Sequence, residues 1–235
     1  MSDLLQGKNC LVTGASRGIG YAIARRLAAR GCNLYLTSRD EKALRKATAD
    51  IKKEAKGSIA SGAYDLTDIP AVKAMVEEAT RTLGHIDVLI NNAGILIVAP
   101  LTETTPEDFG RTMHLNVRAP FLLIKMLVPG MVERGWGRIV NIGSTSSYSG
   151  YADTAAYCAS KHALLGLSRS AQAELQPKGV RVFCVSPGSV KTDMGKQVKN
   201  QDFDTFLEPD AIAERVILLL QNEGDESEVI MKRKQ

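Results

Sequence analysis

The sequence predicts an α/β fold in which helices cover both faces of a parallel sheet. Short apolar runs, typical of buried strands, alternate with amphipathic helix-like segments along the whole 235-residue chain. This alternation is the pattern of parallel α/β domains. No Pro/Ser-rich linker, internal repeat or low-complexity tract interrupts it. We therefore expect one domain over residues 1–235.

Strands are expected where apolar runs are bounded by glycine, proline or polar residues. The runs are 10–12, 33–37, 58–64, 87–90, 137–142 and 179–185, with a candidate short seventh strand at 227–231. Unusual residues (glycines, paired asparagines, a serine) follow the ends of several runs. Because ligands bind at the carboxyl ends of the strands in open α/β sheets, these residues indicate a site along that edge.

Helices are expected in the amphipathic segments between the strands. These segments are 21–30, 41–54, 70–83, 105–134, 154–174 and 209–221. Thr67 and Asp68 can cap the third helix. Thr105 is the expected cap of the fourth, and Pro106 suits its first turn. Pro120 predicts a kink in this long helix, because proline removes a backbone donor and crowds the preceding turn. Residues 189–207 form a polar, irregular stretch.

Composition and charge argue against several classes of function. The chain is 44% hydrophobic, and its net charge is only +4, with acidic and basic residues interleaved. No nucleic-acid partner is expected, because the one basic cluster, residues 232–234, holds only three charges. The first residues lack the pattern of a signal peptide, and no apolar run reaches the length of a membrane span. We expect a cytoplasmic protein without a membrane partner.

Cysteine usage points to the same compartment. The four cysteines are at positions 10, 32, 158 and 184, and no two have CxxC or metal-ligand spacing. We expect reduced thiols of an intracellular protein and no metal site.

A glycine-rich turn lies between the first strand and the first helix. It reads T-G-A-S-R-G-I-G from Thr13 to Gly20. Such glycines let the chain reverse sharply and let its backbone approach a phosphate, which the following helix N-terminus attracts. The spacing G-x-x-x-G-x-G differs from the G-x-G-x-x-G fingerprint of many dinucleotide sites. A merely structural turn is the alternative, but the strand–turn–helix context favours nucleotide binding.

The residues after the second strand bear on which dinucleotide would bind. Arg39, with Arg17 available from the glycine turn, would attract a 2′-phosphate, which favours NADP(H). If Asp40 faces the ribose instead, its carboxylate would accept from the 2′-hydroxyl and favour NAD(H). Both arginines could also be ordinary surface charges.

Asparagines mark two further positions. Residues 91–94, Asn-Asn-Ala-Gly, directly follow the fourth strand, where small residues suit close approach by a ligand. The two asparagines could instead hold their own turn. Asn116 lies between apolar Leu115 and Val117 in the long helix. A buried amide must be hydrogen-bonded, so Asn116 is either a structural bridge or part of a site.

Tyr157 and Lys161 are four residues apart in the segment 154–174 and would share one helix face. A neighbouring cation lowers the pKa of a phenol, which is otherwise about 10. Such a pair can act as a general acid or base. From the spacing alone, an ordinary exposed tyrosine and lysine are the alternative.

Taken together, these residues make the chain resemble the short-chain dehydrogenase/reductase family in its short single-domain form. The resemblance covers roughly residues 6–193. Its motifs, in order, are T-G-x-x-x-G-x-G at 13–20, Asp65, N-N-A-G at 91–94, Asn116, Ser144, Y-x-x-x-K at 157–161, Pro187-Gly188 and Thr192. The resemblance implies a Rossmann-type, doubly wound parallel sheet. It also implies hydride transfer between a nicotinamide cofactor and a carbonyl or secondary alcohol.

The resemblance implies a role for each of four catalytic residues. Tyr157 would give a proton to the carbonyl oxygen in reduction and take it back in oxidation. Lys161 would lower the pKa of Tyr157 and hold the nicotinamide ribose. Ser144 would hydrogen-bond the substrate oxygen in the manner of an oxyanion hole. Asn116 would hold a water that links Lys161 to solvent.

The resemblance also implies a set of cofactor contacts from the pyrophosphate to the nicotinamide. The set is Gly14, Ser16, Arg17, Gly18, Ile19, Gly20, Arg39, Asp65, Leu66, Asn92, Ala93, Gly94, Tyr157, Lys161, Pro187, Gly188, Val190 and Thr192.

Two departures from the family pattern affect substrate and assembly. Only about fifteen residues separate Asp193 from Pro209, so we expect a small or open lid over the substrate. The chain reaches residues 229–232 without the V-D-G-G turn that supports tetramers in the family. A homodimer through the helices that bear Asn116 and Tyr157 is therefore expected ahead of a homotetramer.

The sequence thus predicts an NADP-preferring oxidoreductase acting on a small carbonyl or alcohol substrate. A 3-oxoacyl-carrier-protein reductase, which uses an acyl thioester, and a general carbonyl reductase are the two closest options. A non-catalytic nucleotide-binding regulator is the alternative, and it would predict a broken catalytic set. A sugar epimerase or dehydratase of the extended type would need a larger C-terminal substrate domain.

Overall fold

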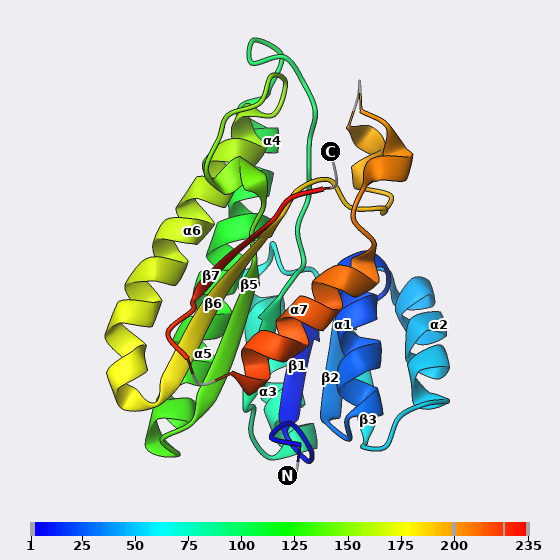
Figure 1. Cartoon of the computed structure of the whole chain (residues 1–235), viewed down its shortest axis with the longest axis vertical. Coiled ribbons are helices and arrows are strands. Elements are labelled where there is room, and N and C mark those ends of the chain that lie inside the picture. The colour runs from blue at the N-terminus through cyan, green and yellow to red at the C-terminus, as the bar shows by residue number, and fades with distance from the viewer. Residues whose placement is uncertain (1–2, 199–200, 223, 234–235) are drawn as a thin grey trace.

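The computed structural model describes residues 3–198, 201–222 and 224–233. Its centre is one sheet of seven parallel strands in the order β3-β2-β1-β4-β5-β6-β7 (Figure 1). The strands are β1 (Asn9–Thr13), β2 (Asn33–Ser38), β3 (Ile59–Ala63), β4 (Val88–Asn91), β5 (Gly137–Ile142), β6 (Val180–Pro187) and β7 (Glu228–Met231). The chain winds outward from β1 in one direction and from β4 in the other, so the predicted doubly wound α/β fold is confirmed.

Helices cover both faces of the sheet. One face carries α1 (Gly18–Ala29), α2 (Glu41–Lys52) and α7 (Pro209–Gln221). The other carries α3 (Ile69–Leu83), α5 (Ala119–Glu133) and α6 (Ala155–Leu175). Asp68 and Thr105 cap their helices as predicted, accepting from the N–H groups of Ala71 and Asp108.

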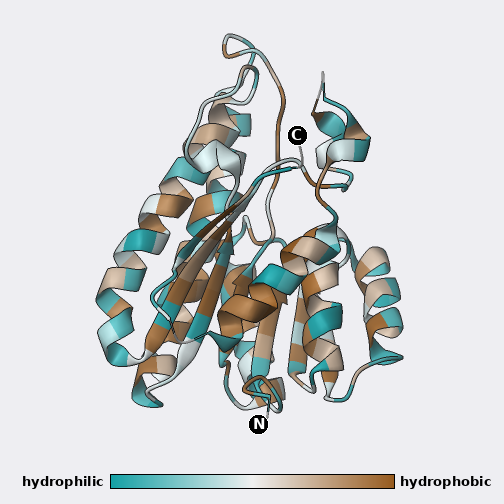
Figure 2. Ribbon diagram, in the orientation of Figure 1, coloured by the Kyte–Doolittle hydropathy of each residue, from teal (hydrophilic) through white to brown (hydrophobic). Residues whose placement is uncertain are grey.

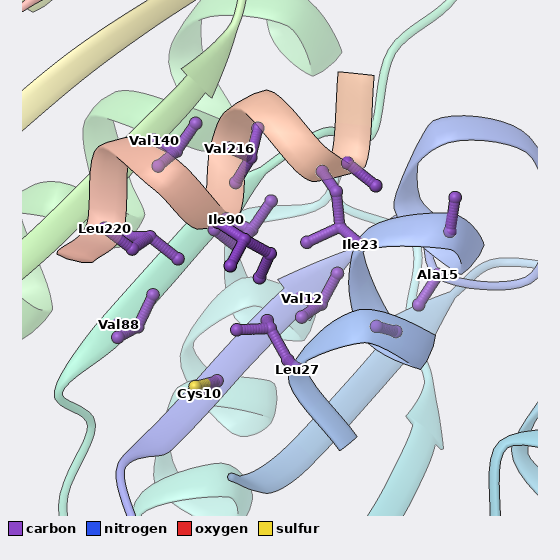
Figure 3. Close-up of a cluster of buried hydrophobic side chains, with 14 of the residues drawn as sticks. Cys10, Val12, Ala15, Ile23, Leu27, Val88, Ile90, Val140, Val216 and Leu220 are labelled. Carbon is purple, nitrogen blue, oxygen red and sulfur yellow. The ribbon is translucent and has the colours of Figure 1, made fainter. Parts of the chain in front are cut away.

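The core forms because successive strand side chains point to opposite faces. In β1, Cys10 and Val12 pack under α1 and α7, whereas Leu11 packs on the opposite face. Figure 3 shows the first cluster, with Ile23 of α1 meeting the strand side chains. Since both faces are covered, the strands are hydrophobic along most of their length, as Figure 2 shows.

The long central helix changes its winding just before Pro120. The structure has α4 (Pro106–Met113), a five-residue π-type turn (His114–Arg118) and then α5, whose second residue is Pro120. In the π-type turn the N–H of Ala119 bonds to the carbonyl of His114. Proline cannot donate the usual bond to the carbonyl four residues earlier, that of Asn116, and the wider turn absorbs this loss before the proline is reached.

The same helix corrects the expectation about membrane-length segments. Residues 106–133 form 28 continuous helical residues with an 18-residue window of mean hydropathy 1.4, enough to span a membrane by length and composition. Much of this apolar character serves the core, because Leu123, Leu127 and Met131 are buried against the sheet. Packing on a sheet is the ordinary explanation for such a helix in a globular domain.

The other boundaries lie within a few residues of the prediction. Helix α1 begins at Gly18, not at 21, because the last glycines of the turn are themselves helical. The candidate seventh strand is confirmed as β7, parallel to β6. The stretch 189–207 contains two short 3₁₀ turns, Gly195–Gln197 and Phe203–Thr205, and a bridge between Val190 and Leu207 closes it at its base.

Candidate active site

A cavity of about 1870 Å³ extends along the carboxyl edge of the sheet. It is lined by the segments that follow all seven strands and by the first turns of α6. Its volume exceeds the range of about 300–1,000 Å³ usual for drug-sized ligands, so a dinucleotide and a substrate could share it. All the site residues selected from the sequence line this cavity except Gly20 and Asn116.

The glycine turn forms a cradle at one end of the cavity. Gly14 and Gly18 have φ angles of +65° and +58°, in the left-handed region that favours glycine. A Cβ on Gly20 would collide with the carbonyl of Gly14 and the amide of Asn92, so Gly20 packs behind the cradle instead of lining it. Helix α1 starts here with no side-chain cap and no acidic residue in its first turn. Its free N–H groups and dipole therefore suit a phosphate.

The asparagines after β4 hold the cradle in place. The Nδ2 of Asn92 donates to the carbonyls of Thr13 and Gly14, at 2.9 and 3.1 Å. The hydroxyl of Thr13 accepts from the N–H groups of Asn92 and Ala93. Asn91 is buried in β4 and donates to Asn141 of β5 at 2.8 Å. Both asparagine side chains therefore donate to other segments instead of to the turn that they belong to. Asn92 also lines the cavity, and its hydrogen bonds join the end of β4 to the glycine turn.

The ribose end of the cavity distinguishes Arg39 from Asp40. The carboxylate of Asp40 caps α2, with Oδ1 accepting from the N–H of Ala43 at 2.9 Å. Arg39 lines the cavity, is exposed and has no ion pair within the described part of the chain. Arg17 is less available than expected, because its guanidinium pairs with Asp193 at 3.2 Å.

Asp65 lies beside Arg39 at this end. Its Oδ1 accepts from the N–H and the hydroxyl of Thr67, at 2.9 and 2.7 Å. These hydrogen bonds, and more weakly the charges of Arg39 and Arg111, lower the pKa of Asp65 against the effect of partial burial. Asp65 therefore adds a fixed carboxylate to the cavity wall, at a position that the family resemblance assigns to cofactor binding.

Ser144, Tyr157 and Lys161 meet at the other end. Ser144 follows β5 and starts the 3₁₀ turn Thr145–Ser147, where its Oγ accepts from the N–H of Ser146. The Nζ of Lys161 donates to the carbonyl of Ile142 at 2.8 Å and lies 5.5 Å from the centre of the Tyr157 ring. The sequence-based expectation that Tyr157 and Lys161 share a helix face agrees with this geometry.

The pKa of Tyr157 moves in the opposite direction from the expectation. Burial raises it to about 12, and a hydrogen bond with Ser144 lowers it only in part. Burial outweighs any lowering by Lys161, whose ammonium donates to the Ile142 carbonyl and lies 5.5 Å from the centre of the ring. Burial lowers the pKa of Lys161 itself to about 8. At neutral pH the phenol is therefore protonated, and the ammonium is largely charged.

Asn116 lies behind the cavity, within the π-type turn. Its Oδ1 accepts from the N–H of Ile95 at 2.9 Å, and its Nδ2 donates to the Ile95 carbonyl and to the Ser160 hydroxyl, both at 3.0 Å. Both side-chain N–H donors are thus used. Of the two alternatives left open by the sequence, the side chain fits the structural bridge, joining the loop after β4 to α6.

Several residues of the cavity wall were not selected from the sequence. Leu96 and Val98, in the loop after β4, give an apolar wall, and Tyr151 contributes from the segment before α6. The apolar run 95–98 signalled this wall, but it resembled neither a strand nor a helix. Lys232 and Arg233, which follow β7, also line the cavity. Among the described residues, no group of three or more His, Cys, Asp or Glu side chains is placed to hold a metal.

Comparison with known proteins agrees with this geometry. Residues 8–202 match the family model of the short chain dehydrogenases, and the chain belongs to this family of oxidoreductases. A Xanthobacter autotrophicus protein named as an inactive 2-(S)-hydroxypropyl-CoM dehydrogenase is 39% identical, over 86% of this chain and 93% of its own. A 3-oxoacyl-(acyl-carrier-protein) reductase of Vibrio cholerae is 36% identical, over 84% and 79%.

Solved structures resemble the fold over nearly its whole length. A metagenomic short-chain oxidoreductase in complex with NADP has a TM-score of 0.87 and 37% identity, over 98% of this chain and 99% of its own. An NAD⁺-bound xylitol dehydrogenase has a TM-score of 0.87 and 30% identity, over 97% and 98%. Similar folds thus bind either dinucleotide.

The burial of the Lys161 ammonium predicts how the free energy of unfolding depends on pH. Because its folded pKa of about 8 lies below the ordinary 10.5, the folded protein loses this proton first, and stability should rise with pH between these values. Between about pH 7.5 and 9.5, urea unfolding should show the wild type gaining about 2 kcal/mol relative to Lys161→Met. Parallel pH profiles for the two proteins would contradict the burial of a charged Lys161.

Proposed function

We propose that the protein is an NADP-preferring oxidoreductase that interconverts a carbonyl and a secondary alcohol. The observation that carries this proposal is the convergence of Ser144, Tyr157 and Lys161 at one end of a cavity whose other end is a glycine cradle. When bound there, the nicotinamide cofactor supplies or accepts the hydride. The intact set of polar groups argues against the alternative of a non-catalytic regulator.

The proton chemistry belongs to Tyr157. Its phenol, held neutral by burial, gives its proton to the carbonyl oxygen during reduction and recovers it during oxidation. The hydroxyl of Ser144 hydrogen-bonds the same oxygen and stabilises the negative charge that develops on it. The ammonium of Lys161, beside the phenol, favours phenolate after the proton has left. Asn116 acts as a positioning residue by fixing α6 against the loop after β4.

The NADP preference rests on Arg39. This guanidinium is exposed at the ribose end, and the competing carboxylate of Asp40 is committed to capping α2. A 2′-phosphate would meet a positive charge there. The NADP-bound structural relative is consistent with this choice, although the NAD⁺-bound one keeps NAD(H) as the alternative cofactor.

Acyl thioesters are the substrate class we favour among carbonyl compounds. The apolar wall of Leu96, Val98 and Tyr151 suits an acyl chain, and reductases of 3-oxoacyl thioesters are among the relatives. A substrate held with its carbonyl oxygen at Ser144 and Tyr157 would extend along this wall.

Replacement of Tyr157 by Phe tests the proton-transfer role. The change removes the hydroxyl and keeps the ring, so turnover of acetoacetyl thioesters should fall at least ~100-fold. NADPH affinity, measured by fluorescence titration, should stay within about threefold, because the ring contacts persist. Turnover retained at the wild-type rate would remove Tyr157 from this role. If the wild type binds NADPH but reduces no compound in a broad carbonyl panel, the regulator alternative is favoured.

Replacement of Arg39 by Asp tests the cofactor preference. The new carboxylate would repel a 2′-phosphate and accept from a 2′-hydroxyl, so the ratio of NADPH to NADH affinity should fall at least ~10-fold. Arg45→Asp is the matched control, because Arg45 is exposed on α2 and does not line the cavity. An unchanged ratio in Arg39→Asp, or an equal change in the control, would mean that another residue sets the preference.

We further propose that the chain forms a homodimer through α4, α5 and α6. Phe109 and Phe121 are exposed on the first two helices, at 44% and 46%. Light scattering should give a dimer for the wild type and dissociation for Phe121→Glu, because a charge would be buried at the interface. Leu218→Glu, at an exposed position of α7, should leave the assembly intact. A monomeric wild type would contradict this assembly, and a tetramer would require a second interface.

A further inference from the structure

The segment after β7 brings two basic residues to the mouth of the cavity. Met231 pairs with Pro187 in the β6–β7 register, and the N–H of Gly188 donates to the Met231 carbonyl at 2.8 Å. Lys232 and Arg233 follow directly, and both line the cavity. Figure 1 shows β7 running toward the edge of the sheet where the loop after β4 and the segment 189–207 lie. The sequence alone offered no use for this basic cluster.

These charges lie close to the reaction centre. A Cβ built on Gly188 would be 3.7 Å from the backbone nitrogen of Arg233 and 3.9 Å from the Cγ2 of Thr145. Thr145 is the residue after Ser144. Gly188 therefore separates the basic segment from the turn that holds the Ser144 hydroxyl. The two charges are therefore near the substrate end of the cavity, which Leu96 and Val98 also line.

The positive charges of Lys232 and Arg233, the basic segment, are not neutralised by an ion pair within the described residues. Two other basic residues of the rim are neutralised, because Arg17 pairs with Asp193 and Lys191 with Glu208, at 3.2 and 2.7 Å. Within the described part of the chain Lys232 makes no ion pair, and Arg233 contacts only the Thr205 hydroxyl, at 3.4 Å.

One further acidic residue of the cavity, Asp153, comes from the segment before α6. No ion pair joins it to Lys232 or Arg233 in the described part of the chain. Two exposed cations at the mouth of an apolar cleft favour a ligand that is apolar at one end and anionic at the other.

We propose that Lys232 and Arg233 bind an anionic group of the substrate, a phosphate or a carboxylate carried on the same molecule as the carbonyl. This inference rests on the proposed function and names the substrate class more narrowly. The carbonyl carbon lies at Ser144 and Tyr157, the chain follows the apolar wall, and the anion reaches the segment after β7. A phosphate would come from the carrier of an acyl thioester, and a carboxylate from a small oxo acid.

The test compares charged and neutral forms of one substrate. Acetoacetyl-CoA carries phosphates, whereas acetoacetyl-N-acetylcysteamine is a neutral thioester with the same reacting carbonyl. In the double variant Lys232→Gln/Arg233→Gln, the KM for acetoacetyl-CoA should rise about fivefold, as expected for two exposed ion pairs. The KM for the neutral thioester and both kcat values should not change. About 0.5 M salt should remove most of the difference.

A second substrate pair identifies the source of the anion. If acetoacetate loses affinity in the double variant and methyl acetoacetate does not, the ligand is a carboxylate. Lys46→Gln/Lys52→Gln is the charge-matched control, since both lysines are exposed on α2 and neither lines the cavity. Turnover of the neutral thioester tests the proposed oxidoreductase function on its own. Without turnover, isothermal titration with acetoacetyl-CoA makes the same comparison.

Three outcomes would overturn the proposal. The first is that neither anionic substrate responds to the double variant. The second is that the neutral thioester weakens as much as acetoacetyl-CoA, which would assign the segment a structural role. The third is a loss of NADPH affinity in the fluorescence titration, which would assign the charges to the cofactor.

Discussion

The hydrogen bond from Lys161 to the carbonyl of Ile142 is the contact on which the site depends. An ammonium is costly to bury, and this one is only 6% exposed. The bond at 2.8 Å offsets part of that cost and joins α6 to the last residue of β5. Ser144 lies two residues beyond Ile142, and Tyr157 lies one turn before Lys161. A single contact therefore sets the spacing between the two hydroxyl groups that face the cavity.

A layer of paired polar side chains extends this anchoring along α6. Asn141 of β5 donates to Ser168 at 2.9 Å and accepts from Asn91 of β4. Asn116 donates to Ser160 at 3.0 Å. Buried polar groups must find partners, so these pairs allow one placement of α6 over β4 and β5 where an apolar interface would allow several. Catalytic geometry at the sheet edge is thus maintained by polar contacts beneath the helix.

The fold was predictable because its signals are local. Apolar runs, caps such as Asp68 and the glycine turn each act over a few residues. The alternation of strands and helices along the chain then indicates a parallel sheet. The π-type turn was not predictable, because Pro120 indicates a disturbed helix without saying how the chain absorbs it. The cavity residues were predictable largely through motifs, and Arg39 was separated from Asp40 only when the cap of α2 was seen.

Effects of burial and distant contact could not be read from the sequence. The spacing of Tyr157 and Lys161 predicted a lowered tyrosine pKa, yet desolvation outweighs it and raises the value to about 12. The sequence left Asn116 open between a structural bridge and a site residue, and only the structure shows that its amide donates to Ile95 and Ser160. The pairing of β7 with β6 brings Lys232 and Arg233 to the cavity, and the sequence did not indicate this placement.

An isotope label can follow the hydride from the cofactor to the carbonyl carbon of the substrate. Enzyme, acetoacetyl-N-acetylcysteamine and NADPH that carries deuterium at both C4 positions of the nicotinamide would be mixed, and the product analysed by mass spectrometry. We expect a secondary alcohol that carries one deuterium on the former carbonyl carbon. An alcohol without the label, or NADPH binding with no alcohol formed from this substrate or a broad carbonyl panel, would contradict it.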